Sequence, residues 1–273
     1  MKPKTEELLY LLLWSAETLI RPTFRNLTDS FESWAYRSGL QRQLARLERL
    51  QLVESRLGPG DTRLVRLTEQ GRLHALGGHD PVACWSRPWD GQWRLVLFDV
   101  AIGNDRQRDR LRLYLRGRGF GYLQQSVWIT PDPLTEEREV LTGARVDVEA
   151  LLLLEARPCA GESNQEIVAG AWDFDRINQR YRRCRQVLER RPRQAPASEA
   201  ERRQLRRWAE EERAAWLDAV RLDPLLPQAL LPAGYLGQET WRLRTRELAA
   251  MAALCAQGEC RQGRLPGPNQ TST

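Results

Sequence analysis

Guanidinium and amide side chains gather on one side of a helix that the sequence predicts from about Ser38 onward. At roughly 100° per residue, Leu40, Leu44 and Leu47 fall within about 40° of one another, and Leu50 lies at the edge of this stripe. The opposite side carries Gln41, Arg42, Ala45, Arg46 and Arg49. Such a helix can pack its leucines against its own core while its other side reaches the phosphates and base edges of duplex DNA.

Positive charge is concentrated around this helix. The chain of 273 residues has a net charge of +6, and residues 37–66 contribute +4 of it through seven arginines and three acidic residues. The arginines are Arg37, Arg42, Arg46, Arg49, Arg56, Arg63 and Arg66. A charged outer face is also the ordinary condition of an amphipathic surface helix, so the interpretation as a DNA reader depends on the elements before and after it.

The surrounding pattern is that of a winged helix-turn-helix over residues 1–79. Two helices are predicted before the arginine-bearing helix. After it come strands at 52–57 and 63–67, joined by a Gly58-Pro59-Gly60-Asp61 turn, and then a short helix following Thr68. Arg63 and Arg66 differ in strand parity, so we expect only one of them to face a phosphate. The predicted DNA contacts are Arg37, Ser38, Gln41, Arg42, Ala45, Arg46, Arg49, Arg56, Arg63 and Arg66, with Gln41 as the foremost base reader.

A second domain is expected at residues 92–191, after a linker at 80–91. Strands are predicted at 93–100, 122–130 and 148–156, with helices at 104–118 and 133–144. This order favours a ferredoxin-like α/β sandwich, which requires one more strand. Residues 167–169 could supply it. A basic helix at 172–191 closes the domain.

The remainder of the chain is predicted to be helical over residues 199–257, with a proline-rich interruption at 223–232 and a disordered tail at 258–273. The whole chain therefore belongs to the α+β class, with a C-terminal helical domain. The basic helix could hold the phosphates of a coenzyme A nucleotide or additional DNA, or could simply be solvated. The candidate effector contacts are Arg176, Arg180 and Arg183.

Several kinds of chemistry are excluded by composition. No lysine follows Lys4, so a Schiff-base lysine or a phosphate-loop lysine cannot occur in the rest of the chain. The five cysteines are scattered and form no C-x-x-C pair, which indicates free thiols in a reducing cytoplasm. The longest apolar run, Leu8–Trp14, is far shorter than the ~20 residues of a membrane span. We expect no secretory signal, no membrane partner, no metal, no cofactor and no catalytic residue.

Six segments of the chain resemble the PaaX-like transcriptional regulators, the repressor family of phenylacetic acid degradation. They are Gln43–Leu47, Leu67–Arg72, Trp93–Val100, Gly119–Ile129, Ala171–Phe174, and Asp223–Pro227 with Leu230–Pro232. The resemblance extends to about Ala256. It implies a homodimeric repressor that leaves its double-stranded operator when an aryl-coenzyme A thioester, such as phenylacetyl-CoA, binds.

The middle segment is also similar to the small CRISPR-associated nucleases of ferredoxin-like fold, which carry an aspartate where this chain has Asp99. As a metal-dependent nuclease, the protein would pair two Asp99 carboxylates across a dimer to hold the ion. Alternatively, Asp99 caps the following helix or pairs with Arg106 or Arg108. A single carboxylate is a sparse metal site, so the structural role is the favoured interpretation.

Overall fold

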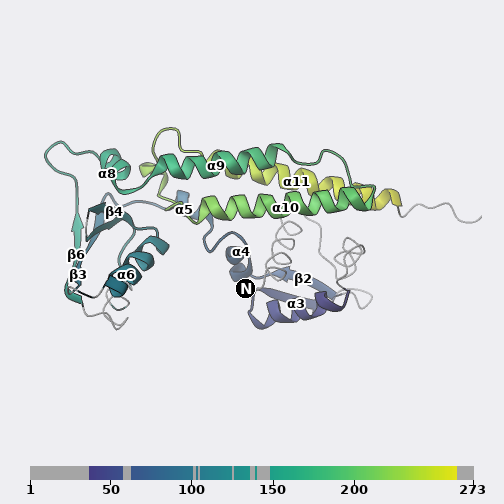
Figure 1. Cartoon of the computed structure of the whole chain (residues 1–273), viewed down its shortest axis with the longest axis horizontal. Helices are drawn as coiled ribbons and strands as arrows, with labels where there is room; N and C mark the ends of the chain where they lie inside the picture. Colours follow the sequence, from purple (N-terminus) through teal and green to yellow (C-terminus); the bar gives the residue numbers. More distant parts are fainter. Residues whose placement is uncertain are drawn as a thin grey trace, which may run out of the picture. The chain divides into compact units, whose positions relative to one another are not determined.

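A computed structural model of the protein describes residues 37–57, 63–100, 103, 105–124, 126–135, 139 and 148–262 (Figure 1). The described residues divide into two compact units. One unit takes in the chain up to Gly78, Arg183–Trp216, and the chain from Gln238 onward; the other takes in His79–Arg182 and Leu217–Gly237. The two helices predicted before Ser38 lie outside the described residues.

The first described elements are a helix, a hairpin and a short helix, in the predicted order. These are α3 (Arg37–Arg49), β1 (Val53–Leu57), β2 (Arg63–Leu67) and α4 (Glu69–Ala75). The two strands pair antiparallel, with Val53 opposite Leu67 and Leu57 opposite Arg63. Leu44 and Leu47 of α3 are fully buried, as the leucine stripe predicts.

Thr68 fixes α4 to the turn that follows α3. Its hydroxyl accepts a hydrogen bond from the Gly71 amide (3.0 Å) as the N-cap and donates one to the Gln51 carbonyl (2.6 Å). A Cβ at Gly71 would lie only 1.9 Å from the Leu52 carbonyl oxygen, so the backbones meet at a distance that only glycine allows.

The second unit is built on a four-stranded antiparallel sheet in the order β4-β5-β3-β6. The strands are β3 (Trp93–Val100), β4 (Gly121–Gln124), β5 (Val127–Thr130) and β6 (Val148–Ala156), and α6 (Asp105–Gly117) connects the first two. This order is the ferredoxin-like one. The helix predicted at 133–144 falls largely outside the described residues.

The prediction that residues 167–169 could supply the fourth strand is wrong. The predicted strand at 122–130 is in fact two strands, β4 and β5, which form a hairpin. Residues 167–169 belong instead to helix α8 (Asn164–Ala171), which Ser163 and Glu166 begin with a reciprocal capping box. The capping box therefore stabilises a helix at these residues.

Apolar clusters cover both faces of this sheet. On one face, Val96 and Phe98 of β3 pack with Leu111 and Leu115 of α6. On the other face, Trp93 and Ile129 pack with Val168, Trp172, Leu226 and Leu230. Leu226 and Leu230, which come after α10, therefore complete the core of a sheet that lies far from them in sequence.

The predicted linker at 80–91 contains a helix, α5 (Pro81–Ser86), whose N-cap is Asp80. The Asp80 carboxylate accepts hydrogen bonds from the amides of Val82 (3.0 Å) and Ala83 (3.3 Å), and Pro81 suits the first helical position. The linker prediction is therefore wrong for these residues.

Three long helices complete the chain: α9 (Phe174–Glu189), α10 (Glu199–Val220) and α11 (Gly237–Gln262), with a short η2 turn (Gln228–Leu230) in the proline-rich segment. The predicted basic helix starts at Phe174 rather than at residue 172, because Trp172 is the extended C-cap of α8. Residues 258–262 belong to α11 rather than to a tail, and residues 263–273 lie outside the described part. No helix in the described part combines the length and the hydrophobicity that crossing a bilayer requires.

Candidate nucleic-acid interface

Helix α3 separates a buried side from a charged side. Leu44 and Leu47 are fully buried, whereas Ala45 and Arg49 are exposed and Arg46 is half-exposed. The Arg49 Nε donates a hydrogen bond to the Ala45 carbonyl at 3.3 Å. The remaining predicted contacts on this helix are Arg37, Ser38, Gln41 and Arg42; they lie within α3, but their side chains are outside the described part.

The hairpin adds a second charged surface. Arg56 and Arg66 expose 76% and 77% of their side chains and share one face with Glu54, which stands opposite Arg66 in the strand register. The Glu54 carboxylate lies 3.9 Å from the Arg56 guanidinium and 3.6 Å from that of Arg66. Exposed ion pairs of this kind contribute little, at most about 1 kcal/mol, so both arginines can exchange Glu54 for a phosphate.

Arg63 and Arg66 differ in strand parity, so they belong to opposite faces of the hairpin. Arg63 pairs with Leu57, and its parity is shared with the buried Val65 and Leu67. Arg66 is therefore the arginine of β2 that the structure shows on the exposed face, while the side chain of Arg63 is outside the described part.

Two acidic residues, Glu48 and Glu54, lie among the arginines of this region. The sequence pattern predicted no contact for either of them. Ser55 Oγ donates a hydrogen bond to Glu48 Oε1, which links α3 directly to β1. The acidic groups thus have different roles: Glu48 holds the helix to the hairpin, and Glu54 partly neutralises the exposed arginines.

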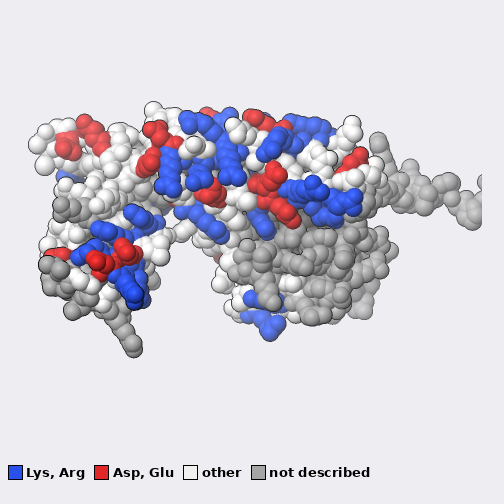
Figure 2. Space-filling model, viewed as in Figure 1, with Lys and Arg blue, Asp and Glu red and all other residues white. Residues whose placement is uncertain are grey.

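The three effector candidates on α9 differ in exposure and in pairing. Arg176 and Arg183 are exposed, whereas Arg180 is half-buried and pairs with Asp218 at 2.8 Å. Figure 2 shows basic side chains along the helices α9 to α11, interspersed with acidic ones. Of the three effector candidates, Arg176 and Arg183 are therefore the two whose guanidinium groups a solvent-borne anion could reach.

Asp99 lies exposed near the end of β3, where the pairing with β6 is irregular between Asp99 and Val100. Of its two expected partners, Arg108 forms an ion pair with Asp105 at 2.7 Å and Arg106 is exposed. The pairing of Asp99 with either arginine stays a prediction. Within the described ranges, no three His, Cys, Asp or Glu side chains lie close enough together to hold a metal ion.

Three cysteines whose side chains the structure describes differ in exposure. Cys84 is half-buried, Cys159 is exposed and Cys184 is buried, and all three are free cysteines. Burial raises the pKa of the Cys184 thiol to about 11 and also raises that of Cys84. These two thiols are therefore protonated near neutral pH and poor nucleophiles.

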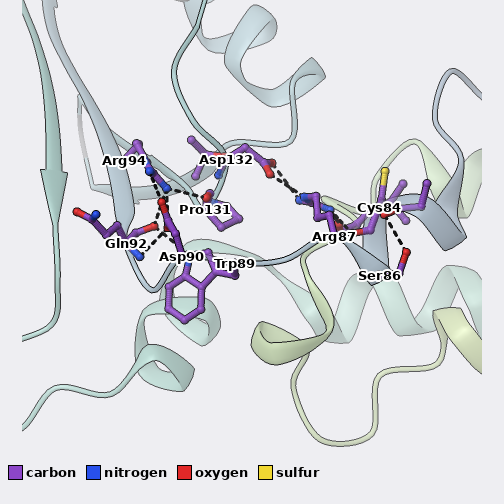
Figure 3. A network of polar contacts seen from close by, with 12 residues as sticks. Cys84, Ser86, Arg87, Trp89, Asp90, Gln92, Arg94, Pro131 and Asp132 are labelled. Carbon is purple, nitrogen blue, oxygen red and sulfur yellow. Dashed lines mark hydrogen bonds and ion pairs between the residues drawn. The ribbon is translucent and has the colours of Figure 1, made fainter.

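Two arginines organise a network of polar contacts beside the central sheet (Figure 3). Arg94 is buried and donates to both oxygens of Asp90, at 2.9 and 2.5 Å, and to the Pro131 carbonyl at 3.2 Å. Arg87 forms a bidentate pair with Asp132, at 2.7 and 3.0 Å. Both arginines therefore tie the α5–β3 segment to the residues that follow β5.

The segment after α10 is held by a buried carboxylate, Asp223. Its Oδ2 accepts hydrogen bonds from the hydroxyls of Tyr181 (2.6 Å) and Tyr235, and its Oδ1 accepts from the Leu225 amide at 2.8 Å. Burial raises the pKa of Asp223, and the two tyrosine hydrogen bonds oppose that rise. Leu225, which the Arg87 guanidinium also contacts through its carbonyl, has a left-handed φ of 49°.

The sequence patterns did not predict this network. The charges at positions 90 and 94 are close enough in the chain to suggest a pair, but Arg87 and Leu225 are 138 residues apart. Arg94 is buried, but Asp90 and Asp132 each expose 46% of their side chains. These hydrogen-bonded groups hold the second unit together.

Comparison with known proteins identifies the central segment. Residues 86–168 match the family model of the PaaX protein central Cas2-like domain. Among solved structures, the chain is similar to uncharacterized protein Rv0674 from Mycobacterium tuberculosis, with a TM-score of 0.55 and 19% identity, over 93% of this chain and 98% of that one. At this identity the likeness concerns the fold alone. No curated protein matches the chain.

Proposed function

Since residues 86–168 are a PaaX-type central domain, as the sequence resemblance predicted, we propose that the protein is a DNA-binding transcriptional repressor. Its N-terminal part acts as a winged helix-turn-helix in which α3 enters the major groove and the β1–β2 hairpin contacts the backbone. The observation that carries this proposal is the division of α3 between buried Leu44 and Leu47 and the solvent-facing Arg46 and Arg49.

The arginines have distinct tasks in this proposal. Arg46 and Arg49 approach the groove from α3 together with Gln41 and Arg42, while Arg56 and Arg66 bind phosphates from the hairpin. Arginine suits both tasks, because its planar guanidinium can bind either a guanine edge or a phosphate through two hydrogen bonds.

We further propose a homodimer that places two recognition helices about 34 Å apart on a palindromic operator. An aryl-coenzyme A effector such as phenylacetyl-CoA releases the DNA in this scheme. The exposed Arg176 and Arg183 on α9 are candidates for its phosphates, whereas Arg180 has to leave Asp218 before it can contribute.

The experiment starts by selecting duplexes from a random pool with the full-length protein, since the operator is unidentified. Fluorescence anisotropy then compares wild type, Arg46→Ala and the charge-matched control Arg157→Ala, an exposed arginine beyond β6. We expect Arg46→Ala to weaken binding by about tenfold, the loss of one good base or phosphate contact. The Arg157→Ala protein should bind within about twofold of wild type, because surface charges away from DNA act weakly.

Two results would contradict the proposal. One is a selection that enriches no duplex. The other is equal affinity of wild type and Arg46→Ala when circular dichroism shows both proteins to be folded. Addition of phenylacetyl-CoA to the bound complex tests the effector separately, with release of the duplex as the expected result.

A further inference from the structure

Helix α6 carries a surface cavity of about 430 Å³ that the proposed repressor function does not use. The described residues that line it are Arg110, Leu113, Tyr114, Gly117 and Arg118. They recur every three or four positions, so they form one face of the helix. We call this cavity the α6 notch. It is a shallow depression beside the helix and is largely open to solvent.

Gly117 leaves one side of the notch open. A Cβ at this position would meet no atom within 4 Å, so the space above the helix is open. Leu113 beside it exposes 73%, although the same helix buries Leu111 and Leu115 against the sheet. The notch therefore combines an open space with an apolar side chain that the described part of the protein leaves in solvent.

The charge around the notch is positive. The acidic residues of α6 are engaged elsewhere: Asp105 pairs with Arg108 at 2.7 Å, and Asp109 lies 3.9 Å from Arg112. No acidic residue is among the described lining residues, and Arg110 is exposed.

A second observation agrees with this sign of charge. The pKa of His79 is lowered first by partial burial and then by the positive charges of Arg118 and Arg87. The field around Arg118 therefore disfavours another cation and favours an anion.

We propose that the α6 notch binds a small organic anion that carries an aromatic or apolar group. The ring would lie over Gly117 between Leu113 and Tyr114, and the anion would face the guanidinium groups of Arg110 and Arg118. An apolar wall with a few charged groups at its rim is the usual composition of a small-molecule site. The inference goes beyond the repressor function, because the notch is on a different helix from Arg176 and Arg183 and its ligand need not be the effector.

Three probes test whether the aromatic ring and the anionic group both contribute to binding at the notch. Ligand-observed NMR on the full-length protein compares phenyl phosphate, which has a ring and an anion, with inorganic phosphate and benzyl alcohol, which each have one. We expect phenyl phosphate to bind at least fivefold more tightly than either. Equal binding of phenyl phosphate and inorganic phosphate, or no binding of phenyl phosphate, overturns the proposal.

Matched variants locate the site. Gly117→Leu fills the notch, and Gly170→Leu makes the same change at another exposed helical glycine, on α8, where a Cβ also meets nothing within 4 Å. Arg110→Gln removes a lining charge, and Arg106→Gln removes an exposed charge of the same helix that does not line the notch. We expect Gly117→Leu and Arg110→Gln to weaken phenyl phosphate binding at least fivefold, and the two controls to leave it unchanged. Equal weakening in a variant and its control overturns the proposal.

A final arm keeps this test independent of the DNA test. Phenylacetyl-CoA binding and duplex binding are measured on the same four variants. Loss of phenylacetyl-CoA binding in Gly117→Leu alone would support the notch and make it the effector site. Loss of phenyl phosphate binding with phenylacetyl-CoA unaffected would support the notch as a separate site. Failure of the wild type to bind DNA would count against the repressor function only.

Discussion

Arg244 and Glu212 form an ion pair in which both side chains are fully buried, with 2.7 Å between Arg244 Nε and Glu212 Oε1. The Arg244 guanidinium also lies over the rings of Trp216 and Trp241, at 4.9 and 5.7 Å. The pair joins α10 to α11 inside the first unit. Desolvation makes an isolated buried charge costly, so each group depends on the other.

We expect Glu212→Gln to lower the free energy of unfolding by about 3–5 kcal/mol, because it leaves the Arg244 charge buried and uncompensated. Its neighbour Glu211 provides the control, since it makes only an exposed pair with Arg190 at 3.4 Å. Glu211→Gln should cost less than about 1 kcal/mol. Urea denaturation followed by tryptophan fluorescence measures both. Similar losses for the two variants would show that burial of the Arg244 pair does not govern stability.

The raised pKa of Asp223 predicts a definite dependence of stability on pH. Between its ordinary value of 3.8 and its higher folded-state pKa, the folded protein binds more protons than the unfolded chain. The contribution of this group to stability is therefore greatest at low pH and falls as the pH rises through that window. We expect Asp223→Asn to make the fall in Tm with rising pH shallower than in wild type.

Removal of one donor to Asp223 is a milder test of the same cluster. Tyr181→Phe keeps the ring and deletes the hydroxyl, so we expect it to cost about 1.5–3 kcal/mol, the usual loss for a hydrogen bond to a charged group. Thermal unfolding at several pH values measures it. An unchanged free energy of unfolding in Tyr181→Phe would mean that the Tyr235 hydroxyl alone satisfies the carboxylate.

Gly71 tests the attachment of α4 to the end of α3. Gly71→Ala would place a Cβ 1.9 Å from the Leu52 carbonyl oxygen, so the backbone has to move, at a cost of about 1–3 kcal/mol for overpacking. Gly170→Ala at the open position on α8 should instead stabilise the protein by up to about 1 kcal/mol, through helix propensity. Chemical denaturation of both variants makes the comparison. Stabilisation by Gly71→Ala would contradict the close approach of the two backbones.

The position of Glu54 on the hairpin predicts that its neutralisation increases the affinity for DNA. Glu54 partly neutralises Arg56 and Arg66, so Glu54→Gln should raise affinity for duplex DNA by about two- to fivefold and steepen its dependence on salt. Glu69→Gln removes the same charge from an exposed position on α4 and serves as the control. Anisotropy titrations at several salt concentrations separate the two. An equal gain for both variants would indicate a general charge effect rather than an interface at the hairpin.

Periodic, local patterns predicted the elements of the candidate interface. Leucines spaced for one face of a helix became the buried Leu44 and Leu47, and the turn residues between 57 and 63 separated two paired strands. The break between β4 and β5 was missed because it contains no glycine or proline, only residues such as Ser126. The capping signals of α5 and α8 were present, at Asp80 with Pro81 and at Ser163 with Glu166, and could have been found.

The contacts inside the second unit could not have been predicted in the same way. Arg87 reaches Leu225, and Trp85 donates to the Tyr235 hydroxyl at 3.0 Å, across 138 and 150 positions of sequence. No period or spacing in one sequence encodes which distant residues meet. The positions of the α9 arginines were predicted, but the engagement of Arg180 by Asp218 depended on how two helices pack.

The second unit has a core that is divided in sequence, since Leu226 and Leu230 complete one face of a sheet whose first strand begins at Trp93. During synthesis this sheet leaves the ribosome well before the residues that cover it. A nascent or truncated chain ending near residue 168 would expose Trp93 and Ile129 to water. Expression of the central segment alone should accordingly give aggregates, and chaperones are expected to hold the growing chain until translation has passed Tyr235.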